Sequence, residues 1–230
     1  MIYLIRHGQT EANIKHIYCG STDLPLSETG VEKLIERRET AALAELRAKA
    51  ATDAAVCGAE SSMSNMLTHK VTFITSGMKR TVQTLELLFG DGKADDSEAV
   101  ESVCDSESAA HFVDPRFREI DFGIFEMQGY DDLKDTPEYQ EWISGDNEVN
   151  VCPGGESGRQ MEVRVMEAFS ELREFFMDDS GRDAVVVTHG GVIAAIMNNL
   201  FPEENKSRFD WQPAPGCGYV IVKESEYMEL

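Results

Sequence analysis

Cysteine is scarce in this chain, and its few copies are scattered. The 230 residues include five cysteines, with no CxxC pair and no histidine at the spacing of a zinc finger. An odd number at irregular intervals argues against a disulfide framework and against a structural metal site. We therefore expect reduced thiols and no bound metal. The cysteines are Cys19, Cys57, Cys104, Cys152 and Cys217.

Long apolar runs are also absent. No stretch approaches the roughly 20 residues that a membrane-spanning helix needs. The N-terminus has no basic segment ahead of an apolar region with a cleavage site, which argues against a secretory signal. Hydrophobic residues make up 42% of the chain, as in a globular protein. We expect a cytoplasmic protein with no membrane partner, in which residues 1–230 form a single domain.

Basic residues are few relative to acidic ones. Lysine and arginine number 21 and aspartate and glutamate 42, so the formal net charge is −21. A nucleic-acid partner is disfavoured, because such binding depends on basic patches that neutralise phosphates. Most of this acidity is expected to be an ordinary solvated surface. If the substrate carries a phosphate, the few basic residues must gather in one pocket.

Two histidines stand where buried strands are expected to end. His7 follows the apolar residues 1–5 and Arg6, and His189 follows residues 184–188. Each histidine is followed at once by glycine. In an open α/β sheet, ligands bind at the carboxyl ends of the strands, so these side chains can meet over one substrate. Either histidine alone could be an ordinary core residue, but the pair suggests an enzyme with a histidine nucleophile.

Apolar runs alternate with helical patterns along the chain. The predicted strands are residues 1–5, 71–74, 184–188 and 218–222, the last of which is expected to be the final strand, and the predicted helices are 28–49, 80–89, 157–178 and 191–200. Ser27 is the expected N-cap of the first long helix. Strands that alternate with helices are typical of a parallel sheet covered on both faces. We therefore predict an α/β fold, a three-layer α/β/α sandwich with a mostly parallel central sheet.

Three segments fall outside this alternation. Residues 50–70 are small and polar, and they either extend the preceding helix or form an insertion. Residues 90–110 are acidic and rich in Gly, Ser and Asp, which predicts a surface loop. Residues 120–158 hold polar stretches with Trp and Tyr, and we expect a lid or insert there. At its end, Ser157 or Glu156 is expected to cap the following helix.

Ordered motifs cover nearly the whole chain. They are RHGQTEAN at 6–13, GSTDLPLSETG at 20–30, SGMKRTVQT at 76–84, FREIDFG at 117–123 and VTHGG at 187–191. In this order they resemble the histidine phosphatase superfamily, the phosphoglycerate mutase-like proteins. FREIDFG followed by PGGES at 153–157 is most similar to the branch with alpha-ribazole phosphatases and broad-specificity phosphomonoesterases. Those relatives usually place Trp-Glu-Gly after the acid, whereas this chain has FEMQG at 125–129.

The residues of these motifs suit phosphoryl transfer. A transferring phosphoryl group spreads charge over three oxygens, so catalysis is mainly positioning and electrostatic stabilisation. Arg6 and Arg80 can each bind phosphate oxygens in a planar fork. His7 must attack as a neutral imidazole, and a carbonyl near Gly8 would fix its tautomer. The first amides of the helix after His189 are expected to point at the bound anion.

The resemblance implies a role for each residue of the site. It assigns the nucleophile to His7, phosphate binding to Arg6, Arg80 and His189, and the general acid and base to Glu119. Asp121 and Glu126 remain alternatives to Glu119. The expected substrate contacts are Gly8, Asn13, Cys19, Gly20 and Gly190, although Cys19 could equally be a small buried filler.

Phosphatase and mutase compete as activities on this scaffold. From Glu119 to Gly158 there is no arginine and a single lysine, Lys134, so a phosphoglycerate carboxylate would find little positive charge. The sequence therefore favours a phosphomonoesterase that forms a phosphohistidine and needs no metal and no cofactor. Its substrate is a small phosphorylated metabolite, with alpha-ribazole phosphate as one candidate. The alternatives are a phosphoglycerate mutase and a non-catalytic protein that binds a phosphorylated ligand; the oligomeric state, monomer or homodimer, stays open.

The remaining histidines and the tryptophans receive ordinary interpretations. His16, His69 and His111 have no supporting partners and are expected at the surface. Trp142 and Trp211 are expected to pack inside the protein, with Trp142 also a candidate for the pocket entrance.

Overall fold

The computed structural model describes residues 1–51, 69–90, 110–145, 148–177, 181–223 and 226–230. The strands are β1 (Ile2–Arg6), β2 (Val71–Thr75), β3 (Ala110–Val113), β4 (Asp183–Thr188), β5 (Gly218–Lys223) and β6 (Glu226–Glu229). The helices are α1 (Glu11–Lys15), α2 (Glu28–Arg38), α3 (Ala41–Ala51), α5 (Lys79–Phe89), α6 (Tyr130–Leu133), α7 (Pro137–Ser144), α8 (Gly158–Phe176) and α9 (Gly190–Leu200). Short 3-10 turns are η3 (Pro115–Phe117), η4 (Gly123–Phe125) and η5 (Pro202–Glu204).

The described strands form one sheet in the order β3-β2-β4-β1-β5-β6. β3, β2, β4 and β1 are mutually parallel, whereas β5 and β6 are antiparallel to their neighbours. β2 and β4 are buried along their full length, which explains why residues 71–75 and 184–188 are continuous apolar or β-branched runs. The prediction of a mostly parallel sheet is confirmed.

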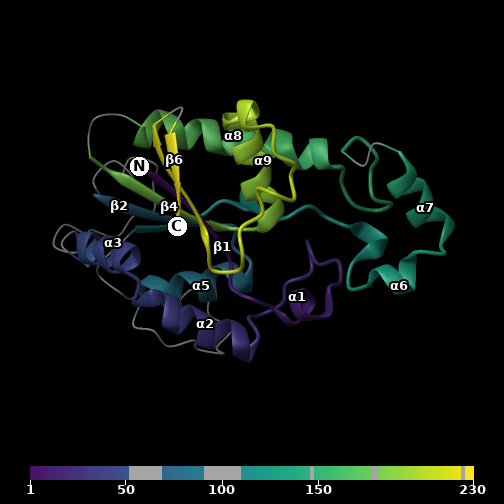
Figure 1. Ribbon diagram of the computed structural model, residues 1–230, viewed down its shortest axis with the longest axis horizontal. Coiled ribbons are helices and arrows are strands. Elements are labelled where there is room, and N and C mark those ends of the chain that lie inside the picture. Colours follow the sequence, from purple (N-terminus) through teal and green to yellow (C-terminus); the bar gives the residue numbers. More distant parts are fainter. Residues whose placement is uncertain (52–68, 91–109, 146–147, 178–180, 224–225) are drawn as a thin grey trace.

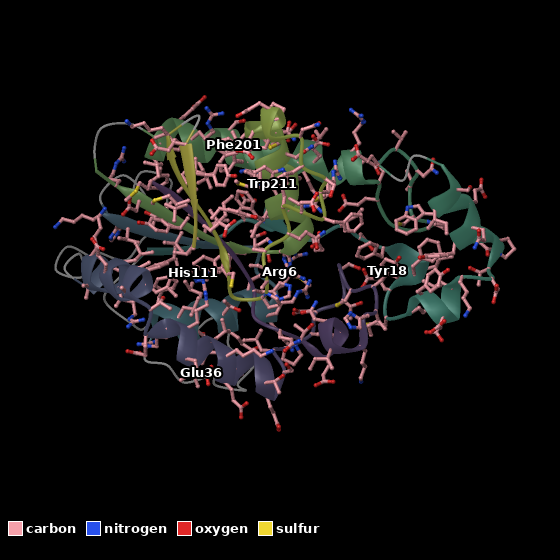
Figure 2. All side chains as sticks on the ribbon, in the orientation of Figure 1. Arg6, Tyr18, Glu36, His111, Phe201 and Trp211 are labelled. Atoms are coloured by element: carbon pink, nitrogen blue, oxygen red, sulfur yellow. The ribbon has the colours of Figure 1, made fainter. Side chains whose placement is uncertain are left out.

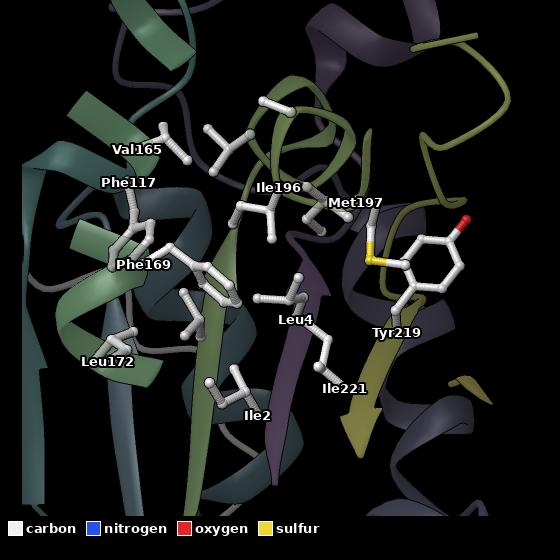
Figure 3. Packing of buried hydrophobic residues seen from close by; sticks show 14 of the residues in the cluster. Ile2, Leu4, Phe117, Val165, Phe169, Leu172, Ile196, Met197, Tyr219 and Ile221 are labelled. Atoms are coloured by element: carbon white, nitrogen blue, oxygen red, sulfur yellow. The ribbon is translucent and has the colours of Figure 1, made fainter. Parts of the chain in front are cut away.

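Helices cover both faces of this sheet (Figure 1). One face packs against α8 and α9, and the other packs against α2, α3 and α5. Alternate residues of one strand serve opposite faces: Leu4 belongs to the first core cluster and Ile5 to the second. Figure 3 shows Val165, Phe169 and Leu172 of α8 packed over the strands, so the predicted apolar stripe of this helix is its buried face. The three-layer architecture is therefore the one that the sequence predicts.

The predicted helix 28–49 is in fact two helices, α2 and α3. The helical conformation is interrupted at residues 39–40, where the amide of Thr40 donates to the carbonyl of Arg37. The guanidinium of Arg38 donates to the carbonyls of Leu87 and Gly90, at 2.7 Å each, and thereby fixes the end of α2 against the end of α5. This contact joins two segments that are distant in the sequence at the point where α2 ends.

Two edge strands were missed by the sequence prediction. β5 is not the final strand, because β6 pairs with it, and β3 begins at Ala110, the last residue of the predicted acidic loop. Glu226–Glu229 is short and largely exposed, so it lacks the apolar alternation that identifies a strand. Most of the segments 50–70 and 90–110 lies outside the described residues.

Residues 120–158 build a small core of their own. Phe125, Leu133, Tyr139, Trp142 and Cys152 are buried together, with Tyr18 and Phe122 packed against them. The rings of Phe125 and Trp142 lie 5.5 Å apart between centroids. Figure 1 shows α6 and α7 set to one side of the sheet. The stretches that the sequence marks as polar therefore turn Tyr139 and Trp142 inward, whereas Tyr130 is exposed.

The histidines outside the motifs are not all at the surface. His16 is exposed, but His69 is buried, so the prediction for His69 is wrong. His111 is half-buried on β3, where its Nε2 lies 2.9 Å from Oγ1 of Thr75, and burial lowers its pKa to about 4. Within the described residues, no helix is both long and apolar enough to cross a membrane.

Candidate active site

The pairing of β1 with β4 brings the two motif histidines together. Arg6 at the end of β1 is opposite Thr188 at the end of β4, and the amide of His7 donates to the carbonyl of Thr188 at 2.9 Å. The next residues along both strands therefore emerge side by side. The rings of His7 and His189 meet edge-on with their centroids 5.2 Å apart. Residues that are far apart in the sequence thus share one place at the carboxyl edge of the sheet.

The ring of His7 is held in one tautomer. Its Nδ1 lies 2.7 Å from the carbonyl oxygen of Gly8, and because a carbonyl can only accept, Nδ1 carries the proton. The lone pair is then on Nε2, the nitrogen that a nucleophile needs. Burial lowers the pKa of His7 well below its usual value, with further lowering by Arg80 and Arg6. His7 is therefore a neutral imidazole at neutral pH.

Two arginines lie beside these rings. Arg6 donates from Nη1 to the carbonyl of Pro213 at 2.8 Å, while its buried Nε has no partner among the described residues. Arg80, at the start of α5, is 1% exposed and donates to the carbonyls of Gly20 and Thr22 at 2.8 and 2.9 Å. Burial lowers the pKa of both guanidinium groups, and Glu119 opposes this. Two guanidinium groups thus lie at the pair of histidines.

Glu119 reaches the N-terminus of α9. Its Oε2 accepts from the amide of Gly191 at 2.9 Å, and its Oε1 accepts from the amide of Ile120 at 3.0 Å. A Cβ at Gly191 would collide with this carboxylate, and one at Gly190 would press on the guanidinium of Arg6. The amide of Gly191, which the sequence analysis reserved for a bound anion, is therefore hydrogen-bonded to Glu119.

The two alternative carboxylates are occupied elsewhere. Glu126 accepts from the amides of Gly20, Ser21 and Thr22, and from the hydroxyl of Thr22 at 2.6 Å. Asp121 accepts from the hydroxyl of Ser21 and from the amide of Gly123. Of the three carboxylates, Glu119 lines the cleft described next. Glu126 instead fixes the 20–22 loop, whose carbonyls hold Arg80.

A cleft of about 600 Å³ opens beside His7. It is lined by Arg6, His7, Asn13, Ile17, Tyr18, Cys19, Glu119, Ile120, Phe122, Trp142, Glu148, Gly158, Met161, Gly191, Ala194, Asn198, Lys206, Ser207, Arg208, Phe209 and Gln212. Of the predicted site residues, Arg6, His7, Asn13, Cys19 and Glu119 are in this lining. Gly8, Gly20, Arg80, Gly190 and His189 are not; they are buried next to residues that are.

Asn13 and Cys19 both have part of their side chains engaged by the protein. Oδ1 of Asn13 accepts from the amide and hydroxyl of Thr10 in the cap of α1, which leaves the amide nitrogen as the group able to reach a ligand. Sγ of Cys19 lies 3.5 Å from the carbonyl of Thr22, and burial raises the pKa of its thiol. Cys19 is half-buried rather than a fully buried filler.

The aromatic wall of the cleft was missed by the sequence analysis, apart from Trp142. Tyr18 and Phe122 line it together with Trp142, and Phe209, which is 84% exposed, lies at its rim. Figure 2 labels Arg6 near the end of β1 and Tyr18 beside the α6–α7 region, the two sides that the cleft separates. Tyr18 exchanges backbone hydrogen bonds with residues 127–128, inside the FEMQG motif that departs from the relatives. That departure was the available signal.

The cationic side chains of the far wall are already paired with acids. Arg208 lies 3.1 Å from Glu148 and 2.9 Å from Glu162. Nζ of Lys206 lies 3.6 Å from Glu204 and 4.1 Å from the ring centroid of Trp211. Positive charge on this wall is therefore largely neutralised. In the described part of the chain, no group of three or more His, Cys, Asp or Glu side chains is arranged to hold a metal ion.

Arg164 of α8 was also missed, and it fixes the backbone that carries Glu119. It donates to the carbonyls of Arg116, Arg118 and Glu119 at 2.8, 2.7 and 3.0 Å. Its guanidinium is also paired with the carboxylate of Glu156, in the PGGES loop. The position of Glu119 thus depends on one side chain that binds three carbonyls between residues 116 and 119. No local pattern in the sequence identifies such a contact.

The geometry agrees with a comparison of the sequence with known families. Residues 2–228 match the profile of the histidine phosphatase superfamily, branch 1. The chain belongs to this superfamily. The family prediction made from the ordered motifs is therefore confirmed, and with it the expectation of an enzyme.

Relatives within the histidine phosphatase superfamily carry two kinds of name. A curated relative is named probable phosphoglycerate mutase GpmB, from Enterobacter sp. (strain 638). It is 25% identical to this chain in an alignment 244 positions long, which covers 100% of this chain and 94% of the relative. The structure of the alpha-ribazole phosphatase from Shigella flexneri has a TM-score of 0.67 at 20% identity, covering 100% of this chain and 94% of that one. The phosphoglycerate mutase from Bacillus anthracis str. Sterne has a TM-score of 0.63 at 19% identity, covering 100% and 90%. These structures show the shared fold.

Proposed function

We propose that this protein is a phosphomonoesterase that works without a metal and forms a phosphohistidine on His7. The observation that carries the proposal is the neutral His7, which has its lone pair on Nε2 and lines the same cleft as Arg6 and Glu119. A nucleophile, a guanidinium for phosphoryl oxygens and a carboxyl group for proton transfer are the parts that the reaction needs.

The reaction proceeds in two displacements. Nε2 of His7 attacks phosphorus, the bond from phosphorus to the ester oxygen breaks, and the leaving oxygen takes a proton from Glu119. Glu119 then accepts a proton from water as that water attacks the phosphohistidine. This step returns neutral His7 and inorganic phosphate. Arg6 and Arg80 offset the charge on the phosphoryl oxygens in both steps.

Hydrolysis fits the charge distribution better than a mutase reaction does. A phosphoglycerate mutase must also hold a substrate carboxylate, and the cations of the far wall, Lys206 and Arg208, are already paired with acids. The names of the relatives keep phosphoglycerate mutase as the second candidate.

The natural substrate is proposed to be a small phosphorylated metabolite. An apolar, aromatic-lined wall suits an alcohol that carries a flat ring, for which alpha-ribazole phosphate is the candidate suggested by the relative's name. We place the protein in the cytoplasm, because its described cysteines are free thiols. We propose no nucleic-acid or membrane partner.

The experiment that tests this function is turnover of p-nitrophenyl phosphate in the presence of EDTA. We expect hydrolysis by the native chain and none by His7→Ala. Folded native protein without turnover would instead support a non-catalytic phospho-ligand binder. A panel of phosphate monoesters, including alpha-ribazole phosphate, sugar phosphates and nucleotides, would then define the substrate. Conversion of 3-phosphoglycerate with a bisphosphate primer, at a rate above its hydrolysis, would replace the phosphatase assignment with mutase.

A further inference from the structure

A chain of buried hydroxyl groups ends on His189. Oγ of Ser76 lies 2.9 Å from Nε2 of His189 and 3.1 Å from Oγ1 of Thr81. Oγ1 of Thr81 in turn donates to the carbonyl of Met78 at 2.7 Å. Ser76, Thr81 and His189 are all fully buried, so each polar atom depends on the partners that the protein supplies.

The distances along this chain favour one direction for each hydrogen bond. Thr81 has a single hydroxyl proton, and the carbonyl of Met78, at 2.7 Å, is a nearer acceptor for it than Oγ of Ser76, at 3.1 Å. Oγ1 of Thr81 must then accept the hydroxyl proton of Ser76. Ser76 has no proton left, so its Oγ accepts from the ring of His189. The proton of neutral His189 is therefore on Nε2.

The other ring nitrogen of His189 is left as an acceptor. Nδ1 is buried and has no hydrogen-bond partner among the described residues. His7, whose proton is fixed on Nδ1 by the carbonyl of Gly8, presents its own lone pair on Nε2. Two neutral histidines in contact thus offer two lone pairs. The dianion of a phosphate monoester has no hydroxyl proton and offers only acceptors, so one of these nitrogens needs a proton when the dianion binds.

We propose that Ser76 and Thr81 are positioning residues that hold His189 as its Nε2–H tautomer, so that a phosphoryl dianion binds together with one proton, which is taken up on Nδ1 of His189. That proton makes the hydrogen bond from His189 to a phosphoryl oxygen. His7 keeps its lone pair and stays the nucleophile. The inference rests on the proposed function in one respect, namely that the phosphoryl group is bound at this pair of histidines.

The charges around His189 support this order of events. Burial lowers the pKa of His189 well below its usual value. Arg80 of α5, His7 just after β1, Arg164 of α8 and Arg6 of β1 lower it further. His189 is therefore neutral without a ligand at neutral pH. A bound dianion opposes these cations and favours the imidazolium. Proton uptake makes phosphate affinity fall about tenfold for each pH unit above neutrality.

Thr81→Val tests the relay without touching His189. The valine removes the acceptor for the proton of Ser76, which then turns to donate to Nε2 of His189. Neutral His189 becomes the Nδ1–H tautomer and binds the dianion with no proton from solvent. The carbonyl of Met78 keeps its bonds from the amides of Thr81 and Val82, so no buried acceptor is left unpaired. Thr81→Ser retains the hydroxyl and is the matched control.

The measurement is calorimetric titration with sulfate, a tetrahedral dianion that carries no proton at pH 8, in buffers of different ionisation enthalpy. The dependence of the heat on the buffer gives the number of protons taken up per sulfate. We expect nearly one for the native chain and for Thr81→Ser, and nearly none for Thr81→Val. Equal proton uptake in native protein and Thr81→Val would overturn the relay.

A spectroscopic measurement decides the tautomer directly. Long-range nitrogen–proton NMR correlations of histidine-labelled protein, without ligand, should show His189 as Nε2–H in the native chain. An Nδ1–H tautomer would refute the inference, even if the enzyme hydrolyses phosphate esters. Native protein that binds no sulfate would refute the proposed site instead, and the NMR result would still decide the relay. If Thr81→Val does not fold, the tautomer of His189 in the native chain still decides the relay.

Discussion

Arg164→Lys is the substitution that best tests how the site is held together. The native guanidinium donates to the carbonyls of Arg116, Arg118 and Glu119 and is also paired with Glu156. A lysine keeps the charge, but its ammonium cannot span three carbonyls and a carboxylate. Hydrogen bonds to charged groups contribute about 1.5–3 kcal/mol each. The variant should therefore lose on the order of 3 kcal/mol of the free energy that holds this segment in place.

Part of this loss should appear in catalysis, because the freed segment carries Glu119. If about half of it misplaces the carboxyl group in the transition state, kcat falls about tenfold, since 1.36 kcal/mol corresponds to a factor of ten. Positioning of an acid matters most when the leaving group is poor. The loss should therefore be small for p-nitrophenyl phosphate and large for an alkyl phosphate.

The assay is kcat and KM for a series of phosphate esters with leaving groups of increasing pKa. Arg159→Lys is the matched control, because Arg159 is exposed on the same helix and its side chain donates no hydrogen bond to the segment of Glu119. We expect the control to behave like the native chain. An equal loss across all leaving groups in Arg164→Lys, or a fall in melting temperature with unchanged kcat, would refute the reasoning.

Other predictions address the nucleophile, the 20–22 loop and pH. His7→Ala should form no acid-labile phosphoenzyme in a rapid-quench experiment, and a burst of normal size would exclude His7 as nucleophile. Glu126→Gln should weaken the bonds to the 20–22 amides, lower the free energy of unfolding by about 1–3 kcal/mol and raise KM through Arg80, which those residues hold; unchanged urea denaturation and KM would contradict this. The pKa of His111 is about 4 in the folded chain, and about 6.5 is usual in unfolded chains. The unfolded chain therefore binds the proton first, and stability falls by up to about 3 kcal/mol as the pH decreases from about 6.5 to 4. His111→Gln should reduce that fall in urea titrations at pH 7 and pH 5; an identical fall in both proteins would argue against it.

The candidate acid illustrates where sequence reasoning reaches its limit. Motif order marks Glu119, Asp121 and Glu126 within a few residues of one another, and nothing local distinguishes them. Glu119 differs because the close approach at Gly191 lets its carboxylate reach the N-terminus of α9. The carboxylate oxygens of Glu126 instead accept hydrogen bonds from the amides of the 20–22 loop. These partners lie 72 to 106 residues away in the chain, and only folding brings them together.

The sequence by itself determined the layers and the pairing of the two motif histidines. Continuous apolar runs form strands buried on both faces, and the residue after such a strand emerges at the carboxyl edge of the sheet. His7 and His189 follow that rule, because the end of a buried strand can be predicted from the hydrophobic residues that precede it in the sequence. The alternation of strands and helices likewise predicted the parallel part of the sheet.

Tertiary structure alone decided which groups are satisfied and which are left to react. The carbonyls bound by Arg164, the acids paired with Arg208 and the hydroxyl chain behind His189 all join segments that are distant in sequence. A hydrogen bond needs atoms within about 3 Å and in line, a condition that composition and periodicity do not encode. The tautomers of the two histidines, and hence the chemistry proposed for them, follow from those long-range contacts.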